Sequence, residues 1–254
     1  CPTSSDTTTI AGPSAAPPLV LLPAVSVGSV AWFANVAALA ARHRVYAVDT
    51  IGDLGLSTLA APVRRPADYA AWLAALFDGL GLDRPAVGGH SYGGWLALTL
   101  ARHRPDRVGR LVLVAPAAAI GAFRLPVWLM LRLSRFVPLR PDVRRILSAQ
   151  TAPGFKPDPD FVRLMQAVSR HGRPEVLFPT RFGDAALRAI AAPTLLVLGE
   201  RETLFDPKAA AERARRLMPD VSVVEIAGAG HLAPMEKPDA VDAAILGFLD
   251  EAGA

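Results

Sequence analysis

The sequence predicts an α/β fold in which a mostly parallel central sheet is flanked by helices, with a helical cap inserted between two of the strands. Two observations support this. Short apolar runs alternate with helical patterns along most of the 254 residues, as in chains built from βα units. One long proline-rich stretch interrupts the alternation and shows no strand pattern. A chain of this length fits one large α/β domain, or a domain with one sizeable insertion.

The predicted strands are short apolar runs separated by helical patterns. They cover residues 19–22, 45–48, 86–88, 111–114, 194–198 and 221–226. Most of the predicted helices have apolar residues spaced three or four apart, which is typical of helices that pack on a sheet. They cover residues 32–41, 67–80, 95–102, 207–217 and 238–249.

The interruption runs from residue 118 to residue 185. Prolines divide it into short helical pieces, and an insertion of this length is too long for a plain connection between two strands. We therefore predict a helical cap at residues 118–185, inserted into a core formed by residues 1–117 and 186–254. One piece, residues 125–137, is strongly apolar and contains Trp128, Met130 and Phe136. Its side chains could pack against the core or line an apolar pocket, and different faces of one helix could do both.

Composition argues against several classes of protein. The net charge of +4 and the pI of about 9.7 come almost entirely from arginine, which is scattered without the aromatic interleaving or lysine-rich tracts of a nucleic-acid surface. No uninterrupted apolar span approaches the roughly 18 residues that a membrane helix needs. We therefore expect no nucleic-acid partner, no stable membrane insertion and a cytoplasmic location.

Cys1 is the one cysteine in the sequence, so an internal disulfide is excluded. It stands first and is followed by a run rich in serine and threonine. One interpretation is a processed bacterial lipoprotein that is anchored through lipid on Cys1. The alternative, which we favour, is a chain whose true start precedes the given sequence.

At residues 88–94 the chain reads GGHSYGG, where a predicted strand gives way to a predicted helix. A sharp turn at this point forces unusual backbone angles on Ser91, and glycines on both sides remove β-carbons that would collide. The Ser91 hydroxyl would then be held out at the edge of the sheet. His90 fills the variable position of the turn, and we expect its side chain to pack beneath it. A serine that only caps the following helix is the alternative.

A serine nucleophile needs a base, and the base needs an acid that orients it. After the last predicted strand the chain reads GAGH, which presents His231 in a glycine-rich turn. Three carboxylates follow the preceding strand: Glu200, which we expect in a solvated turn, Glu202 and Asp206. The chain order is therefore serine, acid, histidine, each just beyond the carboxyl end of a strand.

In these features the sequence resembles the α/β-hydrolase superfamily over nearly its whole length, from residue 19 onward. The matching motifs are the Ser91 turn, the loop DTIGDLGLS at residues 49–57, the acid loop at residues 199–202, and GAGH at residues 228–231 with Glu236 and Pro238. The resemblance implies cleavage of a carboxylic ester or a related acyl compound through an acyl-serine intermediate, without a metal or organic cofactor. The apolar cap piece leads us to expect a small-molecule substrate with apolar groups.

Several other reactions remain open within the same superfamily. They are lactone hydrolysis, thioester hydrolysis, carbon–carbon bond hydrolysis and cyanohydrin cleavage. A non-hydrolytic ligand-binding protein on the same fold is a further alternative, because function depends on the site and not on the fold.

The resemblance also implies roles for individual residues. Ser91 would attack the carbonyl carbon, and His231 would take and return the proton. Family members usually place the acid three residues after the glycine that ends its strand, and counting from Gly199 brings this position to Glu202. Asp206 is the alternative acid, but it directly precedes a predicted helix, which favours a capping role.

Two backbone amides are expected to stabilise the oxyanion. The first is the amide of Tyr92, directly after the nucleophile. For the second, family members usually carry His-Gly just after the first predicted strand, whereas this chain reads Pro23-Ala24-Val25. Proline has no N–H, and alanine adds a β-carbon where glycine permits close approach. The resemblance implies that the amide of Val25 provides the second hydrogen bond, with Ala24 as the alternative.

Overall fold

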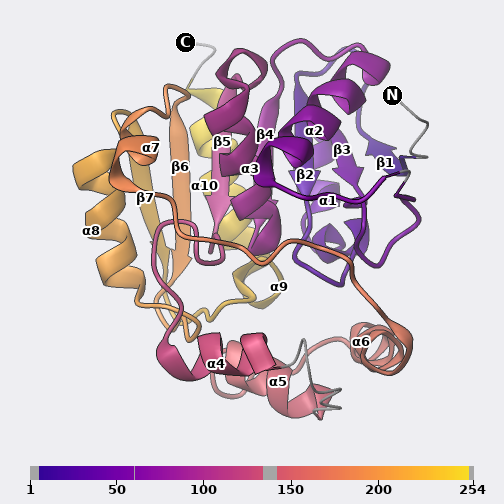
Figure 1. Ribbon diagram of the computed structural model, residues 1–254, viewed down its shortest axis with the longest axis vertical. Coiled ribbons are helices and arrows are strands. Elements are labelled where there is room, and N and C mark those ends of the chain that lie inside the picture. Colours follow the sequence, from indigo (N-terminus) through magenta and orange to yellow (C-terminus); the bar gives the residue numbers. More distant parts are fainter. Residues whose placement is uncertain (1–5, 60, 134–141, 252–254) are drawn as a thin grey trace.

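The computed structural model describes residues 6–59, 61–133 and 142–251. Within these residues, seven strands form one sheet in the order β1-β3-β2-β4-β5-β6-β7 (Figure 1). Every neighbouring pair is parallel except β1 and β3. The strands are β1 Thr8–Ala11, β2 Pro18–Leu22, β3 Arg44–Val48, β4 Ala86–His90, β5 Arg110–Val114, β6 Thr194–Gly199 and β7 Val221–Ile226. The predicted mostly parallel sheet is confirmed.

The central strands β2, β4, β5 and β6 are almost completely buried. Strands of a parallel sheet that is covered on both faces read as continuous apolar runs, which explains why the sequence pattern located them. All six predicted strands are present, each within two residues of its predicted bounds. The edge strand β1 was not predicted: its four residues are partly exposed and include Thr8 and Thr9.

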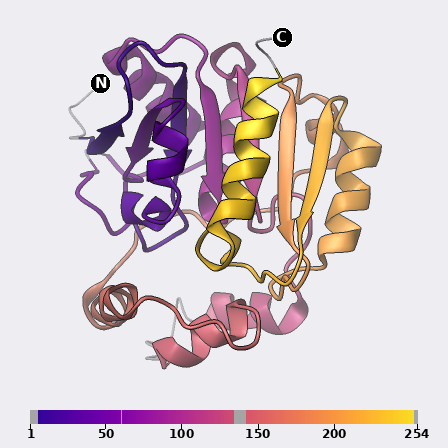
Figure 2. The same cartoon turned by 180° about the vertical axis from the view of Figure 1, so that it is seen from behind.

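Helices cover both faces of the sheet (Figures 1 and 2). Helices α2, α3 and α8 pack on one face, where Val20 and Leu22 point. Helices α1 and α10 pack on the other, where Leu19 and Leu21 point, so alternate residues of one strand belong to the two layers of the core. These helices are α1 Val36–Ala40, α2 Pro66–Leu80, α3 Tyr92–His103, α8 Pro207–Leu217 and α10 Pro238–Asp250.

Four of the five predicted core helices agree with the structure to within a few residues, but the helix predicted at residues 32–41 is wrong in its first half. There the chain forms a short 3-10 helix, Ser29–Trp32, and α1 begins only at Val36. The Trp32 side chain is buried and its indole N–H donates to the carbonyl of Leu22 at 3.3 Å. Trp32 therefore contacts the end of β2 from a separate short helix, and the spacing of apolar residues could not distinguish this from one continuous helix.

A helical insertion lies between β5 and β6, as predicted. We call its helices α4, α5 and α6 the cap, which lies along one edge of the core, at the bottom of Figure 1. Helices α5 and α6 start at aspartate N-caps, Asp142 and Asp158, whose carboxylates accept amide hydrogen bonds from the first turn. Phe136 lies outside the described residues. The helices of the insertion are α4 Leu125–Leu133, α5 Val143–Gln150, α6 Pro159–His171 and α7 Asp184–Arg188.

The insertion leaves and rejoins the core at one place on α8. The buried guanidinium of Arg213 donates to the carbonyl of Ile120 at 2.8 Å on the outgoing chain. It also donates to the carbonyl of Phe182 at 2.7 Å and contacts the Asp184 carboxylate at 2.6 Å on the returning chain. The amide of Phe182 donates directly to the carbonyl of Ala119 at 3.0 Å. The two ends of the insertion are therefore bonded to each other and to one arginine.

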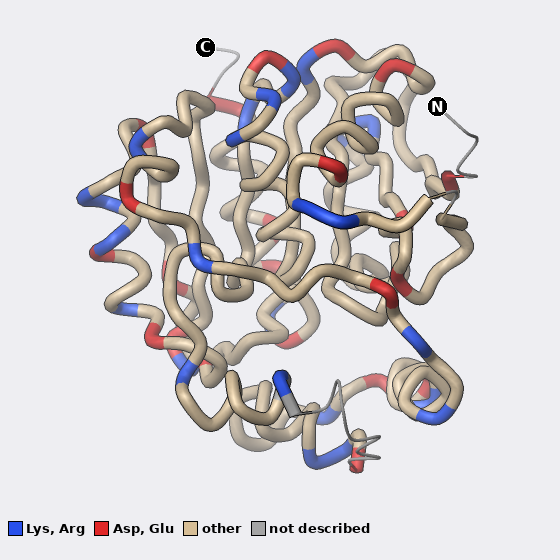
Figure 3. Tube along the Cα trace, in the orientation of Figure 1, with Lys and Arg blue, Asp and Glu red and all other residues tan. Residues whose placement is uncertain are grey.

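Acidic and basic residues are distributed over both the core and the cap (Figure 3). In the three described ranges, no helix is both long enough and apolar enough to cross a membrane. Cys1, the attachment point in the alternative of a lipid anchor, lies outside the described residues.

Candidate active site

Ser91 occupies the sharp turn between β4 and α3. Its backbone angles, φ 52° and ψ −112°, lie in a region that side-chain-bearing residues rarely adopt. Two glycines make the turn possible, because a β-carbon on Gly89 would collide with the backbone of Gly93, and one on Gly93 would collide with the Leu22 carbonyl. The Ser91 amide donates to the carbonyl of Val114 at 2.9 Å, which attaches the strained turn to β5. The expected strand-turn-helix geometry around Ser91 is present.

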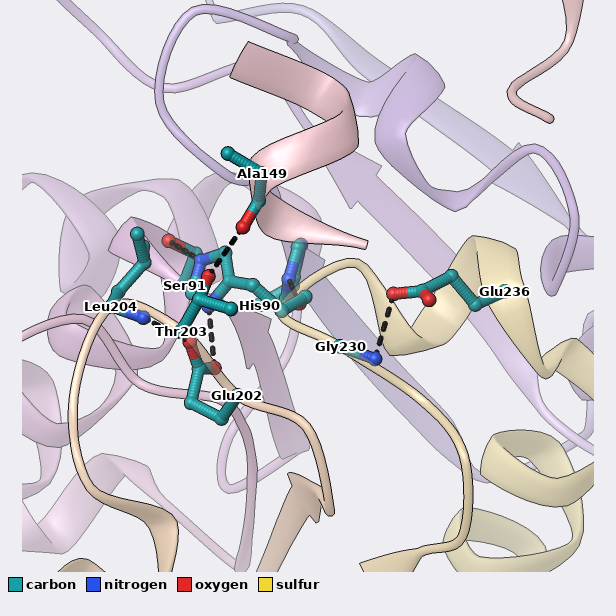
Figure 4. Close-up of polar contacts among 9 residues, drawn as sticks. His90, Ser91, Ala149, Glu202, Thr203, Leu204, Gly230 and Glu236 are labelled. Atoms are coloured by element: carbon teal, nitrogen blue, oxygen red, sulfur yellow. Dashed lines mark hydrogen bonds and ion pairs between the residues drawn. The ribbon is translucent and has the colours of Figure 1, made fainter. Parts of the chain in front are cut away.

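The side chains of Ser91, His231 and Glu202 form one hydrogen-bonded line. Figure 4 labels Ser91 and Glu202, the two ends of this line. His231 Nε2 lies 2.9 Å from Ser91 Oγ, and His231 Nδ1 lies 2.7 Å from Glu202 Oε2. All three residues are buried. A carboxylate can only accept, so Nδ1 carries the proton and Nε2 of a neutral ring is free to accept the proton of the serine hydroxyl. This is the tautomer that a general base needs.

Glu202 is held in its ionised form. Burial raises the pKa of its carboxyl, but the neighbouring His231 and the hydrogen bonds from His231 and from the Leu204 amide outweigh this effect. The pKa therefore lies below its ordinary value. The Leu204 amide donates to Oε1 at 2.8 Å, so the two carboxylate oxygens have one donor each. A carboxylate fixed in this way orients the His231 ring.

The two other carboxylates of the same loop have different partners. Asp206 is the N-cap of α8, where its Oδ1 accepts the amide of Ala209 at 3.1 Å. Glu200 is exposed, as expected of a solvated turn, but its Oε2 also accepts the amide of Gly228 at 2.7 Å. Both carboxylates thus serve local backbone structure, and Glu202 is the one that contacts His231.

The backbone around the serine offers donors for an oxyanion. Tyr92 is the first residue of α3, so its amide has no partner within the helix. Its ring is buried, and its hydroxyl donates to the carbonyl of Leu177 at 3.0 Å, so the side chain serves packing. The loop that contains Val25 follows β2, and the lack of a side chain on Gly93 lets the start of α3 approach the carbonyls of Leu22 and Pro23. The structure therefore brings the two predicted oxyanion segments together.

Two aspartates, Asp49 and Asp53, hold this loop, and neither was predicted as a site residue. The amide of Ser26, next to Val25, donates to both carboxylate oxygens of Asp53, at 2.9 and 2.7 Å. The amide of Ser29 donates to Asp49 Oδ1 at 2.6 Å. Burial raises the pKa of Asp53, although the amide hydrogen bonds oppose this effect. Both aspartates belong to the motif at residues 49–57, which is the sequence feature from which their role could have been predicted.

His90 packs beneath the turn, as expected, but it also contacts the candidate base. Its Nε2 lies 2.8 Å from the backbone carbonyl of His231, and a carbonyl can only accept, so Nε2 carries the proton. Burial, reinforced by the neighbouring His231, lowers the pKa of His90 to about 3. His90 is therefore neutral near pH 7 and is suited to hold the His231 backbone rather than to exchange protons with substrate.

The family model described as "Alpha/beta hydrolase family" matches residues 19–244 of the chain. Two proteins of Bacillus subtilis (strain 168) are similar over most of its length. Carboxylesterase YbfK is 33% identical over 245 residues, which cover 94% of this chain and 82% of that protein. The uncharacterized carboxylesterase nap is 32% identical over 246 residues, which cover 94% of this chain and 81% of that protein.

Solved structures give the same relationship. The crystal structure of carboxylesterase CesB (YbfK) from Bacillus subtilis matches with a TM-score of 0.89 at 31% identity, and the match covers 96% of this chain and 87% of that one. The crystal structure of naproxen esterase (carboxylesterase NP) from the same species matches with the same TM-score, identity and coverage. Since 96% of this chain is included, the likeness extends from the sheet into the helical insertion.

Proposed function

This chain belongs to the alpha/beta hydrolase family, and from that membership we propose that it is a carboxylesterase that works through an acyl-serine intermediate on Ser91. One observation carries the proposal: the hydrogen-bonded line from Ser91 through His231 to Glu202. The similarity to two carboxylesterases supports an ester as the substrate rather than the other acyl compounds that the superfamily handles.

In the first half of the proposed reaction, Ser91 Oγ forms a bond to the carbonyl carbon of the ester while its proton passes to His231 Nε2. Glu202 stabilises the positive charge that forms on the imidazole. Collapse of the tetrahedral intermediate breaks the bond to the alcohol oxygen, which takes the proton from Nε2. The acyl group remains on Ser91.

In the second half, water attacks the acyl carbon and gives a proton to His231 Nε2. Collapse breaks the bond to Ser91 Oγ, which receives this proton, and the carboxylic acid is released. The enzyme returns to its starting protonation state. In both halves the amides of Tyr92 and Val25 are the proposed donors to the oxyanion, and Asp53 would hold the second of them in place through Ser26.

We also propose that residues 118–185 form a unit that selects apolar substrates. Apolar side chains of α4 are accessible, among them Trp128 and Met130, which are 42% and 43% exposed. Phe178, on the returning chain, lies near the same helix, because the Arg132 guanidinium is 5.6 Å from the Trp128 ring and 5.7 Å from the Phe178 ring. These groups would favour uncharged acyl or alcohol groups.

The test combines covalent labelling with turnover. A fluorophosphonate should label the wild-type protein at Ser91, and p-nitrophenyl esters should be hydrolysed. Ser91→Ala should abolish the label and lower kcat by about 10⁶-fold, the loss seen when one member of a cooperating triad is removed. A folded wild-type protein that neither reacts with the probe nor cleaves esters would instead favour the non-hydrolytic alternative. Full activity in Ser91→Ala would exclude the serine mechanism.

A further inference from the structure

The end of α5 is bonded to both loops that supply the candidate base and acid. The His231 amide donates to the carbonyl of Gln150, the last residue of α5, at 2.7 Å. The Thr203 hydroxyl, next to Glu202, donates to the carbonyl of Ala149 at 2.8 Å (Figure 4). The last carbonyls of a helix have no partner inside it, so these two are available as acceptors. The cap thus contacts the chain at His231 and at the residue next to Glu202.

The side chain of Glu236 makes a second connection, or junction, between the His231 loop and the chain just after α5. Its Oε1 accepts the amide of Gly230, the residue before His231, at 3.0 Å (Figure 4). Its Oε2 accepts the amide of Ala152, just beyond α5, at 2.6 Å. The junction is also tight, because a β-carbon on Gly230 would collide with the backbone of Gln150 and Thr151. One carboxylate therefore joins the backbone before the base to the backbone that follows the cap helix.

We propose that Glu236 is a positioning residue for His231 and that, through it, the cap sets the position of the base. This inference rests on the proposed function. The backbone of His231 is fixed by Gln150 at its amide and by His90 at its carbonyl, and its ring is fixed by Ser91 and Glu202. Loss of either Glu236 contact would break the link between Gly230 and Ala152, and the base would lose its register with the serine. A displacement of about 1 Å in reacting groups can lower a rate by about 100-fold.

Two variants break the junction from opposite sides. In Glu236→Gln the side-chain oxygen can accept one amide, but the side-chain NH₂ faces the other amide, so one hydrogen bond is lost. In Ala152→Pro the amide that Oε2 accepts is removed while Glu236 is intact. The preceding residue, Thr151, is already extended at φ −112° and ψ 162°, a conformation that suits a residue before proline. Glu212→Gln, an exposed glutamate on α8, is the matched control.

Turnover is measured per active site, which is counted from the acylation burst with a p-nitrophenyl ester. We expect kcat to fall by at least about tenfold in Glu236→Gln and Ala152→Pro, with KM within about twofold of wild type. The effects of the two changes should not multiply in the double variant, because both break the same bridge between Gly230 and Ala152. Glu212→Gln should match the wild type. A purely structural role would instead lower the melting temperature and the number of active sites while leaving kcat per site unchanged, and this result would overturn the proposal.

A second readout does not depend on ester turnover. The His231 Nδ1 proton, held between the ring and Glu202, should give a far-downfield proton NMR signal, and we expect it to broaden in Glu236→Gln but not in Glu212→Gln. If the wild type cleaves no ester but the signal still broadens, the proposed function fails and the positioning role stands. If the wild type is an esterase and neither the signal nor kcat per site changes in Glu236→Gln, the positioning role fails.

Discussion

Glu202→Gln is the sharpest test of the candidate active site. In the wild type, each carboxylate oxygen of Glu202 accepts one hydrogen bond, from the Leu204 amide at 2.8 Å and from His231 Nδ1 at 2.7 Å. Glutamine has the same shape but only one accepting oxygen. If its oxygen faces Leu204, its NH₂ faces His231, and the ring must then accept at Nδ1 and carry its proton on Nε2. That tautomer cannot take the proton of Ser91.

The expected loss in kcat is about 10⁴-fold, the effect of the analogous acid-to-amide change in a serine triad, which equals about 5.5 kcal/mol of transition-state stabilisation. Stability should change little, because glutamine keeps the shape of the side chain and, once the ring has changed its tautomer, both hydrogen bonds. The assay is steady-state hydrolysis of a p-nitrophenyl ester, together with thermal unfolding of the same preparations.

Asp206→Asn is the control in the same loop. Asparagine also caps helices well, so Asp206→Ala is measured beside it and should lose about 0.5–2 kcal/mol of stability, the value of an N-cap hydrogen bond. Neither change should affect kcat by more than a few-fold. If Glu202→Gln stays within about tenfold of wild-type kcat while Asp206→Asn loses catalysis, the assignment of the acid to Glu202 is refuted.

Two further predictions concern stability and specificity. Burial raises the pKa of Asp242 from 3.8 to about 6, although a 2.8 Å hydrogen bond from the Asn35 side chain opposes this. Protonation of Asp242 favours the folded state; this contribution to stability is fully present below pH 3.8 and is lost as pH rises through 6. Asp242→Asn should therefore stabilise the protein by up to about 3 kcal/mol at pH 8 and by little at pH 4. Urea unfolding at the two pH values measures the difference. Trp128→Ala should lower the rate for long-chain relative to short-chain acyl esters, because an exposed apolar ring of the cap is removed.

Each of these has its own contrary result. An Asp242→Asn protein whose gain in stability is equal at pH 4 and pH 8 would show that the buried charge is not the cause. For Trp128→Ala, the melting temperature should stay within a few degrees of wild type, since the ring is 42% exposed. If Trp128→Ala and the wild type have the same relative rates over the acyl-chain series, Trp128 has no role in substrate selection.

The central sheet could be predicted from sequence because its strands are buried on both faces. Such strands give continuous apolar runs, and β2, β4, β5 and β6 are of this kind. The edge strand β1 lacks this signal, because it pairs on one side and carries polar threonines. The start of α1 was missed for a different reason: Trp32 is apolar at helical spacing but contacts the end of β2.

The candidate site divides in the same way. Ser91, His231 and Glu202 stand in local turns whose glycines are visible in the sequence, so they could be predicted before the structure. The contacts that hold them involve backbone groups of distant residues, such as the Gln150 carbonyl, which accepts the amide of His231 from 81 positions away. Every residue has a carbonyl and nearly every residue an amide, so no residue type in the cap marks such a contact.

The junction at Arg213 has a consequence for how this chain can change by insertion and deletion. Ile120 and Phe182, at the two ends of the segment that contains α4, α5 and α6, both accept from Arg213, and β5 and β6 are neighbouring strands, so this segment is a closed loop on the sheet. Doubling the length of a flexible loop costs only about 0.6 kcal/mol of closure entropy, so segments of very different length can be grafted there without disturbing the core. The proposed positioning role sets a different limit on such grafts: a graft must also provide a carbonyl that accepts the amide of His231 and an amide that donates to Glu236. Under the proposed positioning role, a graft that lacked them should fold and yet leave His231 without these two supports.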